Sequence, residues 1–583
     1  MIASRAGCIA LVLALPAGVR AQDAGTLQIR DLTPGEVRME AFQIEMPATL
    51  RIDAIGAESG GLNRLVRMRN AVVRLVSRVI DQDVPTFVEE WGATAWIIEA
   101  ASREMVWRLD AMDTRESDRG LRSFEGELRL SAGTYEVFYA SFPHTGGHDH
   151  HGPGWLYDRQ AASKLRLDLE IEGAELLRVD PAERRARFEA SNVIALGRSG
   201  GERHERVAFD VARPVDVDLY MVGEATRNRS YDHGWVIDAD TREPVWAFDW
   251  VRSQPAGGAS RNRVVRERLT LPAGRYAAFF SRDGSHGPGS WQALPPNDPA
   301  AWGLSIRPVS AADRDAFRTY EYQPVPEGQA IVSMTGVGHD ATRSAGFILT
   351  RATDIRFFAL GEGSDQAMHD AAWLENASTF EPVWTMEFEK TGHAGGAGKN
   401  RLFDGVVHLP AGTYIAHYST DGSHAYDDWN GEPPMDPEFW GLTILPAREE
   451  LTADMTLPYD RASDPAVIAR VERVGSGHHV RRSFQLESDG DVRVYALGEG
   501  SSGEMYDYAR IMDATGREVW RMRYEDTVHA GGSGKNRRVN TVLHLAAGAY
   551  DVIYRTDDSH AWDDWNSTRP SDPESWGVTV RRN

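Results

Sequence analysis

The strongest constraint on this chain is a phrase that it contains twice in nearly the same letters. Residues 421–440 read DGSHAYDDWNGEPPMDPEFW, and residues 557–576 read DDSHAWDDWNSTRPSDPESW. The two copies end at Trp440 and Trp576, 136 positions apart, and a reduced third copy ends at Trp302, 138 positions earlier. Solenoid repeats span only about 20–50 residues. This longer period therefore indicates a tandem array of whole domains.

Each copy has the pattern of short strands. In the last one, residues 484–487 and 492–497 alternate apolar and polar positions, and the turn residues 513–516 separate two further stretches of the same kind. Such alternation with Gly, Asp and Pro turns is typical of a β-sandwich. We therefore predict an all-β chain of four tandem antiparallel, jelly-roll-like β-sandwich domains. The expected boundaries are a signal peptide at 1–21 and domains at 22–178, 185–310, 329–446 and 467–583.

The first domain departs from this plan through an insertion at about residues 60–80. Its apolar residues follow helical spacing, and its arginines fall on the opposite face. We expect an amphipathic helix whose apolar stripe packs on a sheet. The alternative is a basic helix that contacts an anionic membrane or partner.

The N-terminal sequence predicts that the protein is exported. Arg5, the apolar run Cys8–Pro16 and the small residues before Gln22 resemble a secretory signal. Cys8 is the single cysteine, so the mature chain would have no disulfide and no thiolate. No later stretch reaches 18 apolar residues, which predicts no transmembrane segment. The formal charge of −22 argues against a nucleic-acid partner. We expect a periplasmic or secreted protein.

A turn motif of the form L-x-A-G-x-Y recurs before a closing aromatic strand. It occurs at 130–135, 271–276 and 409–414, and Leu545–Tyr550 has the same form. This strand and turn pattern resembles the bacterial pre-peptidase C-terminal type of β-sandwich module. The resemblance implies exported, tandem domains that act as accessory or binding modules and not as catalysts.

The repeated tryptophans have a structural interpretation. Large aromatic side chains at fixed positions would anchor the long loops and close each sandwich. The Asp-Gly and Asp-Pro steps would then form turns. Eleven of the seventeen tryptophans recur in this way: Trp107, Trp246, Trp384 and Trp520; Trp155, Trp291, Trp429 and Trp565; Trp302, Trp440 and Trp576.

A second interpretation is a metal site in the repeated phrase. Clustered carboxylate and amide oxygens on a loop are the ligands that Ca²⁺ prefers. The second domain has lost the central pair of aspartates, and the spacing matches no EF-hand. The candidate calcium ligands are Asp427, Asp428, Asn430 and Asp436, with Asp563, Asp564, Asn566 and Asp572 as their copies.

A third interpretation joins this loop to a glycine-rich phrase, His393–Arg401 and its copy His529–Arg537. If both loops lie at one end of the sandwich, their cations, acids and aromatics could form a groove for a glycan or peptide. Equally, Lys399 or Arg401 could pair with an aspartate and only tie the loops together. The candidate ligand-binding residues are Lys399, Asn400, Arg401, His424 and Trp429, with Lys535, Asn536, Arg537, His560 and Trp565 as copies.

The first domain has a histidine cluster of its own. Imidazole nitrogens at this density can ligate Zn²⁺, Cu²⁺ or Ni²⁺, whether specifically or adventitiously. The candidate ligands are His144, His148, His150 and His151.

Catalytic signals are weak. Gly197–Gly201 matches the nucleophile-elbow pattern but leads into a strand instead of a helix. Ser423 and His424 are adjacent, so on an extended segment they point to opposite faces. We therefore predict a non-catalytic binding or accessory protein of the cell envelope. The alternative is a metal-dependent hydrolase of envelope polysaccharide or peptide that uses His424, Asp427 and Asp428.

Overall fold

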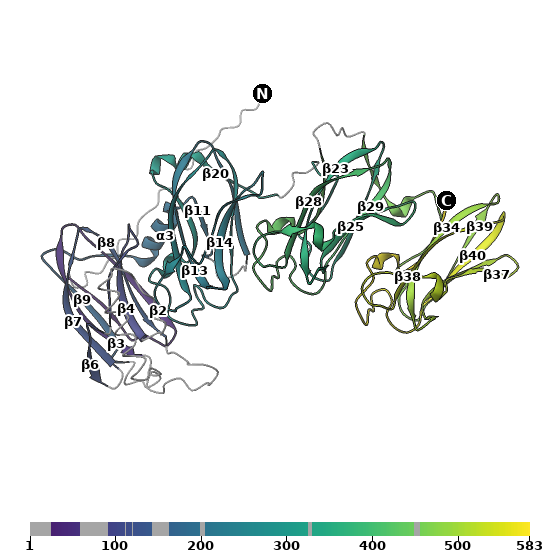
Figure 1. Cartoon of the computed structure of the whole chain (residues 1–583). Helices are drawn as coiled ribbons and strands as arrows, with labels where there is room; N and C mark the ends of the chain where they lie inside the picture. The colour runs from purple at the N-terminus through teal and green to yellow at the C-terminus, as the bar shows by residue number, and fades with distance from the viewer. Residues whose placement is uncertain are drawn as a thin grey trace, which may run out of the picture. The chain divides into compact units, whose positions relative to one another are not determined.

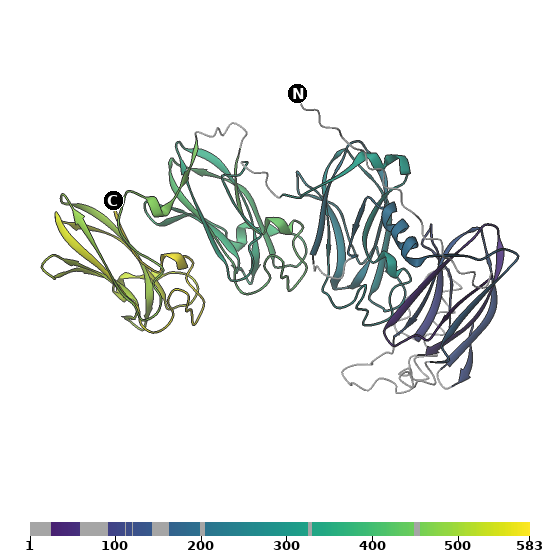
Figure 2. The ribbon, with the colours of Figure 1, turned by 180° about the vertical axis from the view of Figure 1, so that it is seen from behind.

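The computed structural model confirms an all-β, multi-domain sandwich architecture. It describes residues 25–58, 91–110, 112–118, 121–142, 163–198, 204–323, 329–447 and 455–583. The chain divides into two compact units, residues 1–320 and residues 321–583. Each unit holds two β domains in chain order, which we number 1 to 4 (Figure 1, and from behind in Figure 2). Every pairing between the named strands is antiparallel in the part of the chain that is described.

Domains 1 and 2 share one topology. In each, the strands form one ten-stranded sheet, in which β3 pairs with β4 in domain 1 and β13 pairs with β14 in domain 2 through a β-bulge. The strands of domain 1 are β1 (Thr26–Arg30), β2 (Glu36–Ile44), β3 (Ala48–Glu58), β4 (Trp91–Glu99), β5 (Met105–Arg108), β6 (Arg115–Asp118), β7 (Leu121–Leu130), β8 (Gly133–Ser141), β9 (Arg166–Glu172) and β10 (Leu177–Val179). Those of domain 2 are β11 (Ile194–Leu196), β12 (His204–Val211), β13 (Val215–Thr226), β14 (Arg229–Asp238), β15 (Pro244–Ala247), β16 (Gln254–Pro255), β17 (Asn262–Leu271), β18 (Gly274–Ser281), β19 (Gly303–Pro308) and β20 (Phe317–Tyr320).

Domains 3 and 4 repeat the plan with two separate sheets each. In domain 3 the sheets have the orders β21-β30-β23-β28-β27 and β26-β25-β29-β22-β31. The strands of domain 3 are β21 (Val332–Thr335), β22 (Thr342–Leu349), β23 (Thr353–Ser364), β24 (Ala367–Met368), β25 (Ala371–Asn376), β26 (Glu381–Thr385), β27 (Gly392–His393), β28 (Asn400–Leu409), β29 (Gly412–Ser419), β30 (Gly441–Pro446) and β31 (Thr456–Tyr459). Those of domain 4 are β32 (Val467–Val471), β33 (His479–Leu486), β34 (Gly490–Ser501), β35 (Glu504–Met505), β36 (Tyr508–Asp513), β37 (Glu518–Arg521), β38 (Val528–His529), β39 (Asn536–Leu545), β40 (Gly548–Arg555) and β41 (Gly577–Arg582).

Helices are few and short among the described residues. The α-helix α3 (Pro181–Ser191) follows β10, with Asp180 as its N-cap and Pro181 in its first turn. Single-turn 3₁₀ helices precede the closing strands of domains 2, 3 and 4, namely η1 (Pro299–Ala301), η4 (Pro437–Phe439) and η7 (Pro573–Ser575). The others are η2 (Ala311–Ala316), η3 (Phe388–Lys390), η5 (Arg461–Ser463) and η6 (Tyr524–Asp526). None of the helices described is long and apolar enough to cross a membrane.

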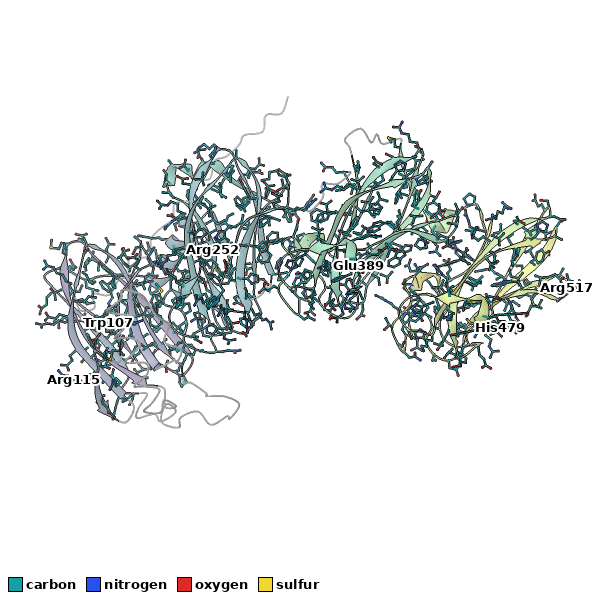
Figure 3. The ribbon with its side chains drawn as sticks, viewed as in Figure 1. Trp107, Arg115, Arg252, Glu389, His479 and Arg517 are labelled. Atoms are coloured by element: carbon teal, nitrogen blue, oxygen red, sulfur yellow. The ribbon has the colours of Figure 1, made fainter. Side chains whose placement is uncertain are left out.

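The cores lie between the sheets, where side chains fill each sandwich (Figure 3). In domain 3, Phe347, Phe357, Tyr414 and Ile444 come from both sheets and are almost fully buried. The L-x-A-G-x-Y motif has a local cause, because the Tyr414 hydroxyl donates to the Pro410 carbonyl at 2.8 Å and closes the turn. The tyrosines of the other three copies make the same bond.

The segments between the predicted domains carry more structure than the sequence indicated. The helix α3 begins in the segment between the first two predicted domains and continues into the predicted second domain. The strands β20 and β31 lie in the segments left between the predicted domain boundaries, yet they pair with β12 and β22 of the preceding domains. The predicted helical insertion at 60–80 and the signal peptide fall outside the described residues.

A buried arginine joins domains 1 and 2 within the first unit. Arg103, in the turn between β4 and β5, is 5% exposed. Its Nη1 lies 2.6 Å from Glu136, and its Nε donates to Asp298 of domain 2 at 2.8 Å. The ring of Phe188 in α3 lies under the guanidinium, 4.6 Å from its central carbon. Because Arg103, Glu136 and Asp298 are all buried, the charge of each is stabilised by the opposite charges beside it.

We expect Arg103→Ala to destabilise the first unit by about 3–5 kcal/mol, because it removes the buried ion-pair partner of Asp298 and one of the two arginines that pair with Glu136, the other being Arg184. Differential scanning calorimetry of the full chain measures the loss. The matched control is Arg51→Ala, which removes a solvent-exposed arginine that pairs with Glu127 and Glu172. Equal melting temperatures for the two variants would contradict the role of Arg103.

Candidate functional site

The two repeated loops of domain 3 meet at a buried asparagine. Asn400 is 0% exposed, and its amide donates to the carbonyls of Gly395 at 2.8 Å and Glu432 at 2.9 Å. Its Oδ1 lies 2.6 Å from Nε2 of His424. One side chain thus links the glycine loop to the Asp/Trp loop. Asn536 makes the equivalent three contacts in domain 4.

The glycines of the glycine loop allow this close approach. Gly396 has a φ of 66°, and a Cβ at this position would lie 1.9 Å from the Pro433 carbonyl oxygen. Only glycine avoids that collision while keeping a left-handed backbone. The glycines of this phrase therefore have a packing explanation.

The histidine of the repeated phrase is neutral and inaccessible. Because the Asn400 amide nitrogen donates to two carbonyls, its oxygen faces His424, so Nε2 of His424 must carry the proton. His424 is 0% exposed, and burial lowers its pKa to about 3. Its ring stands edge-on to Trp429 and to the fully buried Trp440, at centroid distances of 5.1 and 5.8 Å. His424 therefore acts as part of the loop core.

The cations of the glycine loop have partners other than the two central aspartates. Lys399 forms an ion pair with Glu362 at 2.8 Å and also donates to the Asn430 side chain. Arg401 donates to the Thr391 hydroxyl at 2.9 Å. In domain 4, Lys535 pairs with Glu499 and Asn566, and Arg537 with Thr527.

The predicted calcium ligands do not come together as one group. Asp427 and Asp428 are exposed, and Asp427 has a φ of 64°, a left-handed conformation that aspartate tolerates. Asp436 is buried and accepts a hydrogen bond from Tyr322 at 2.7 Å. In domain 4, Asp563 is again left-handed, and Asp564 accepts from Ser476. Asp572 lies 3.7 Å from Arg461, and the four histidines His144, His148, His150 and His151 lie outside the described residues.

A different acidic group is brought together in three of the domains. Among the described residues, three sets of carboxylates have ligand atoms within 4.8 Å of one another. We call them the acidic triads. They are Glu224, Asp232 and Asp283 in domain 2; Glu362, Asp370 and Asp421 in domain 3; and Glu499, Asp507 and Asp557 in domain 4.

Backbone hydrogen bonds shape the triad of domain 3. Glu362 lies near the end of β23, and its carbonyl accepts the N–H groups of His369 and Asp370 across the short hairpin to β25. Asp370 Oδ1 accepts the N–H of Asp421 at 2.8 Å. Asp421 Oδ1 in turn accepts the N–H of Ser423 at 2.9 Å. These bonds use one oxygen of each aspartate and leave the others available.

The remaining oxygens are buried with few polar partners. Asp370 is 0% and Glu362 is 6% exposed, and Oε2 of Glu362 has no hydrogen-bond partner among the described residues. Among the same residues, Oδ2 of Asp370 has only the Trp440 indole beside it, and the equivalent Oδ2 of Asp507 accepts the indole N–H of Trp576 at 3.1 Å. Asp421 is half-buried and connects the group to solvent. With Lys399 as the cation beside it, a fully ionised triad carries a net charge of −2.

Crowding of these charges changes their titration. Burial, reinforced by the negative charges of Asp421 and Glu362, raises the pKa of Asp370 to about 8. The same causes raise the pKa of Asp232 and of Asp507 to about 8. A carboxyl with such a raised pKa keeps its proton near neutral pH.

Domain 1 has apolar residues at the triad positions. Ala57 pairs with Ala93 across β3 and β4, as Glu224 pairs with Asp232 across β13 and β14. Phe142 follows β8 where Asp421 follows β29. All three replacements are buried. Domain 1 thus has apolar side chains at the positions where the other three domains have carboxylates.

Sequence reasoning missed the acidic triads, although signals were present. A Gly-Glu step lies near the end of the third strand of domains 2, 3 and 4, and an aspartate follows each Glu eight positions later. The third members, Asp421 and Asp557, are the first letters of the repeated phrase itself. Asp427 and Asp428 are adjacent in the sequence, whereas the members of a triad are brought together only by folding.

Comparison with known proteins adds no assignment. No model of a known protein family matches the sequence, and a search of curated proteins returns no match.

We expect Asn400→Ala to destabilise domain 3 by about 2–4 kcal/mol, because it leaves two carbonyls and one imidazole N–H buried without partners. Calorimetric unfolding of the full chain measures this loss. Asn430→Ala, an exposed change in the Asp/Trp loop that removes the hydrogen bond from Lys399, serves as the control and should have a much smaller effect. If both variants melt alike, the buried link is not what holds the two loops together.

Proposed function

We propose that the protein is an exported, non-catalytic binding or accessory protein of the cell envelope whose domains 2, 3 and 4 each hold a divalent cation, calcium, in the acidic triad. The observation that supports this most is the threefold recurrence of buried carboxylate oxygens without hydrogen-bond partners. An isolated acidic cluster would carry little weight. A buried one that is kept in three domains and lost in a fourth carries more.

The chemistry of the donors favours a hard cation. Each triad offers carboxylate oxygens alone, and Ca²⁺ takes six to eight oxygen ligands from carboxylates, carbonyls and water. Zinc and copper prefer imidazole or thiolate, which the triads lack. The net charge of −2 matches one divalent ion. Water can complete the coordination on the side of the half-buried aspartate.

Export accords with this assignment. Extracellular calcium modules bind the ion at about 10⁻⁴–10⁻³ M, a concentration suited to compartments outside the cytoplasm. The signal-like N-terminus predicts that location, and the resemblance to pre-peptidase C-terminal modules predicts a non-catalytic role. The proposed ions would stabilise the loops that the triads border.

The alternative, a metal-dependent hydrolase that uses His424, Asp427 and Asp428, receives less support. A general base must reach solvent or substrate, whereas His424 is completely buried and its Nε2–H faces Asn400.

We expect calcium to raise the melting temperature and to bind with a stoichiometry of three per chain. At a concentration of 100 times Kd, one site adds about 2.7 kcal/mol of stability to the domain that holds it. Calorimetric titration and thermal unfolding, with EDTA as the reverse, measure both effects. The triple variant Asp232→Asn, Asp370→Asn, Asp507→Asn should lose them.

The matched control is the double variant Asp427→Asn, Asp563→Asn, which changes the ligands predicted from sequence and leaves the acidic triads intact. It should keep three ions. Loss of binding in this control, or no calcium effect on the wild-type protein, would contradict the assignment to the triads.

Without metal, the triads should make stability depend on pH. The pKa of Asp370 lies near 8 in the folded chain, against 3.8 for the unperturbed group. A raised carboxyl pKa contributes stability that is complete below about pH 4 and is lost as the pH rises to about 8. We therefore expect the difference in melting temperature between wild type and the triple asparagine variant to fall over this range in EDTA. In calcium the slope should disappear, and an equal slope in calcium and EDTA would count against cation binding.

A further inference from the structure

The two domains inside each unit meet through equivalent residues. In the first unit, Arg103 in the turn after β4 contacts Asp298, which also accepts the hydroxyl of Tyr220 at 3.0 Å. In the second unit, Phe380 occupies the same turn after β25 and has the same left-handed backbone. Its ring stacks on Tyr495 of domain 4 at 4.5 Å and 9°. The two junctions can therefore be compared position by position.

An apolar cluster closes the junction of the first unit. Trp96 packs with Phe138, Phe142 and Leu294. The indole N–H of Trp96 also donates to the Asn297 carbonyl of domain 2 at 2.6 Å. Aromatic and aliphatic side chains from both domains thus exclude water from this contact.

The same positions are polar in the second unit. Trp373 stands opposite His417 on β29, as Trp96 stands opposite Phe138 on β8. Asp421 stands at the position of Phe142. Thr568 stands at the position of Leu294, because the backbone carbonyl of each accepts a hydrogen bond from the buried asparagine of its domain. Here a cavity of about 1380 Å³ lies between domains 3 and 4. We call it the interdomain groove.

Contacts of domain 4 with domain 3 border the groove. Arg569 donates to the carbonyls of Asp340 at 2.7 Å and Thr420 at 2.9 Å. Asn540 donates to the Thr379 carbonyl at 2.7 Å. Directed hydrogen bonds therefore join domains 3 and 4 beside the groove.

Three half-buried tryptophans line the groove: Trp373 from domain 3, and Trp562 and Trp565 from domain 4. One face of Trp373 is covered by the buried His417 ring, which is parallel to it within 3° at 4.8 Å. Trp562 lies under Arg473. Such supported indoles present rigid flat surfaces at small entropic cost.

The charge of the lining restricts the ligand. Six acidic side chains and two arginines line the groove, with Asp421 of the acidic triad among them. This excess of negative charge disfavours polyanions. The cavity exceeds the 300–1,000 Å³ typical of drug-sized ligand sites, so it has room for several linked rings.

We propose that the interdomain groove binds a neutral oligosaccharide, with sugar rings stacked on Trp373, Trp562 and Trp565 and hydroxyl groups hydrogen-bonded to the polar lining. This inference rests on the proposed binding role and names its ligand class, but it does not require the calcium ions. Domain 1 has closed the equivalent junction with Phe142, so the groove belongs to the second unit among the described junctions.

The test titrates the full chain, in calcium, with cellohexaose, maltohexaose and chitohexaose by isothermal calorimetry. We expect at least one of them to bind. Trp373→Ala and Trp562→Ala should each weaken its binding about tenfold, the loss of one aromatic contact. Tyr506→Ala removes an aromatic side chain that is 39% exposed and outside the groove, and it should bind as wild type does.

Anionic and cationic probes complete the test. Hexagalacturonate should not bind, because the lining is acidic. The proposal is overturned if none of the neutral hexasaccharides binds, if both tryptophan variants bind as tightly as wild type, or if hexalysine alone binds. Calcium binding is measured on the same samples, and the tryptophan variants should keep all three ions. Failure of the oligosaccharide proposal can therefore be told apart from failure of the cation sites.

Discussion

The central constraint in domains 2 to 4 is the burial of three carboxylates beside one another. Taking charges from water into a protein interior costs several kcal/mol per ion unless they are paired. A single cation, Lys399 in domain 3, compensates only part of the triad. Burial and the neighbouring negative charges still raise the pKa of Asp370. A bound cation would relieve this repulsion, whereas domain 1 avoids it by using Ala57, Ala93 and Phe142.

The triads also connect the local architecture to the groove. Asp421 belongs at once to the triad, to the start of the repeated phrase and to the groove lining. The loop that follows it is secured separately, through Asn400, His424 and the edge-to-face pair of Trp429 and Trp440. One phrase thus combines a packing element, which all three copies keep in part, with a carboxylate that faces solvent. The phrase recurs with both the residues that pack the loop and the aspartate that belongs to the triad.

The sequence predicted the fold well because its signals are local. Alternating strands, the L-x-A-G-x-Y turns and a constant period are all readable without knowing which strands pair. The site was less predictable because Glu362, Asp370 and Asp421 come from three separate segments. Conversely, Asp427 and Asp428 are neighbours in sequence but do not join a cluster in space. Asn400 looked like an exposed donor, and only the folded loops show that it is buried.

The most direct test of the central claim is anomalous diffraction from crystals of the full chain soaked in strontium, a calcium substitute. The account predicts one peak at each acidic triad, beside Asp232, Asp370 and Asp507, and none beside Ala93 of domain 1. Crystals without peaks at the triads, or with peaks only at Asp427 to Asn430 and its copy, would contradict it.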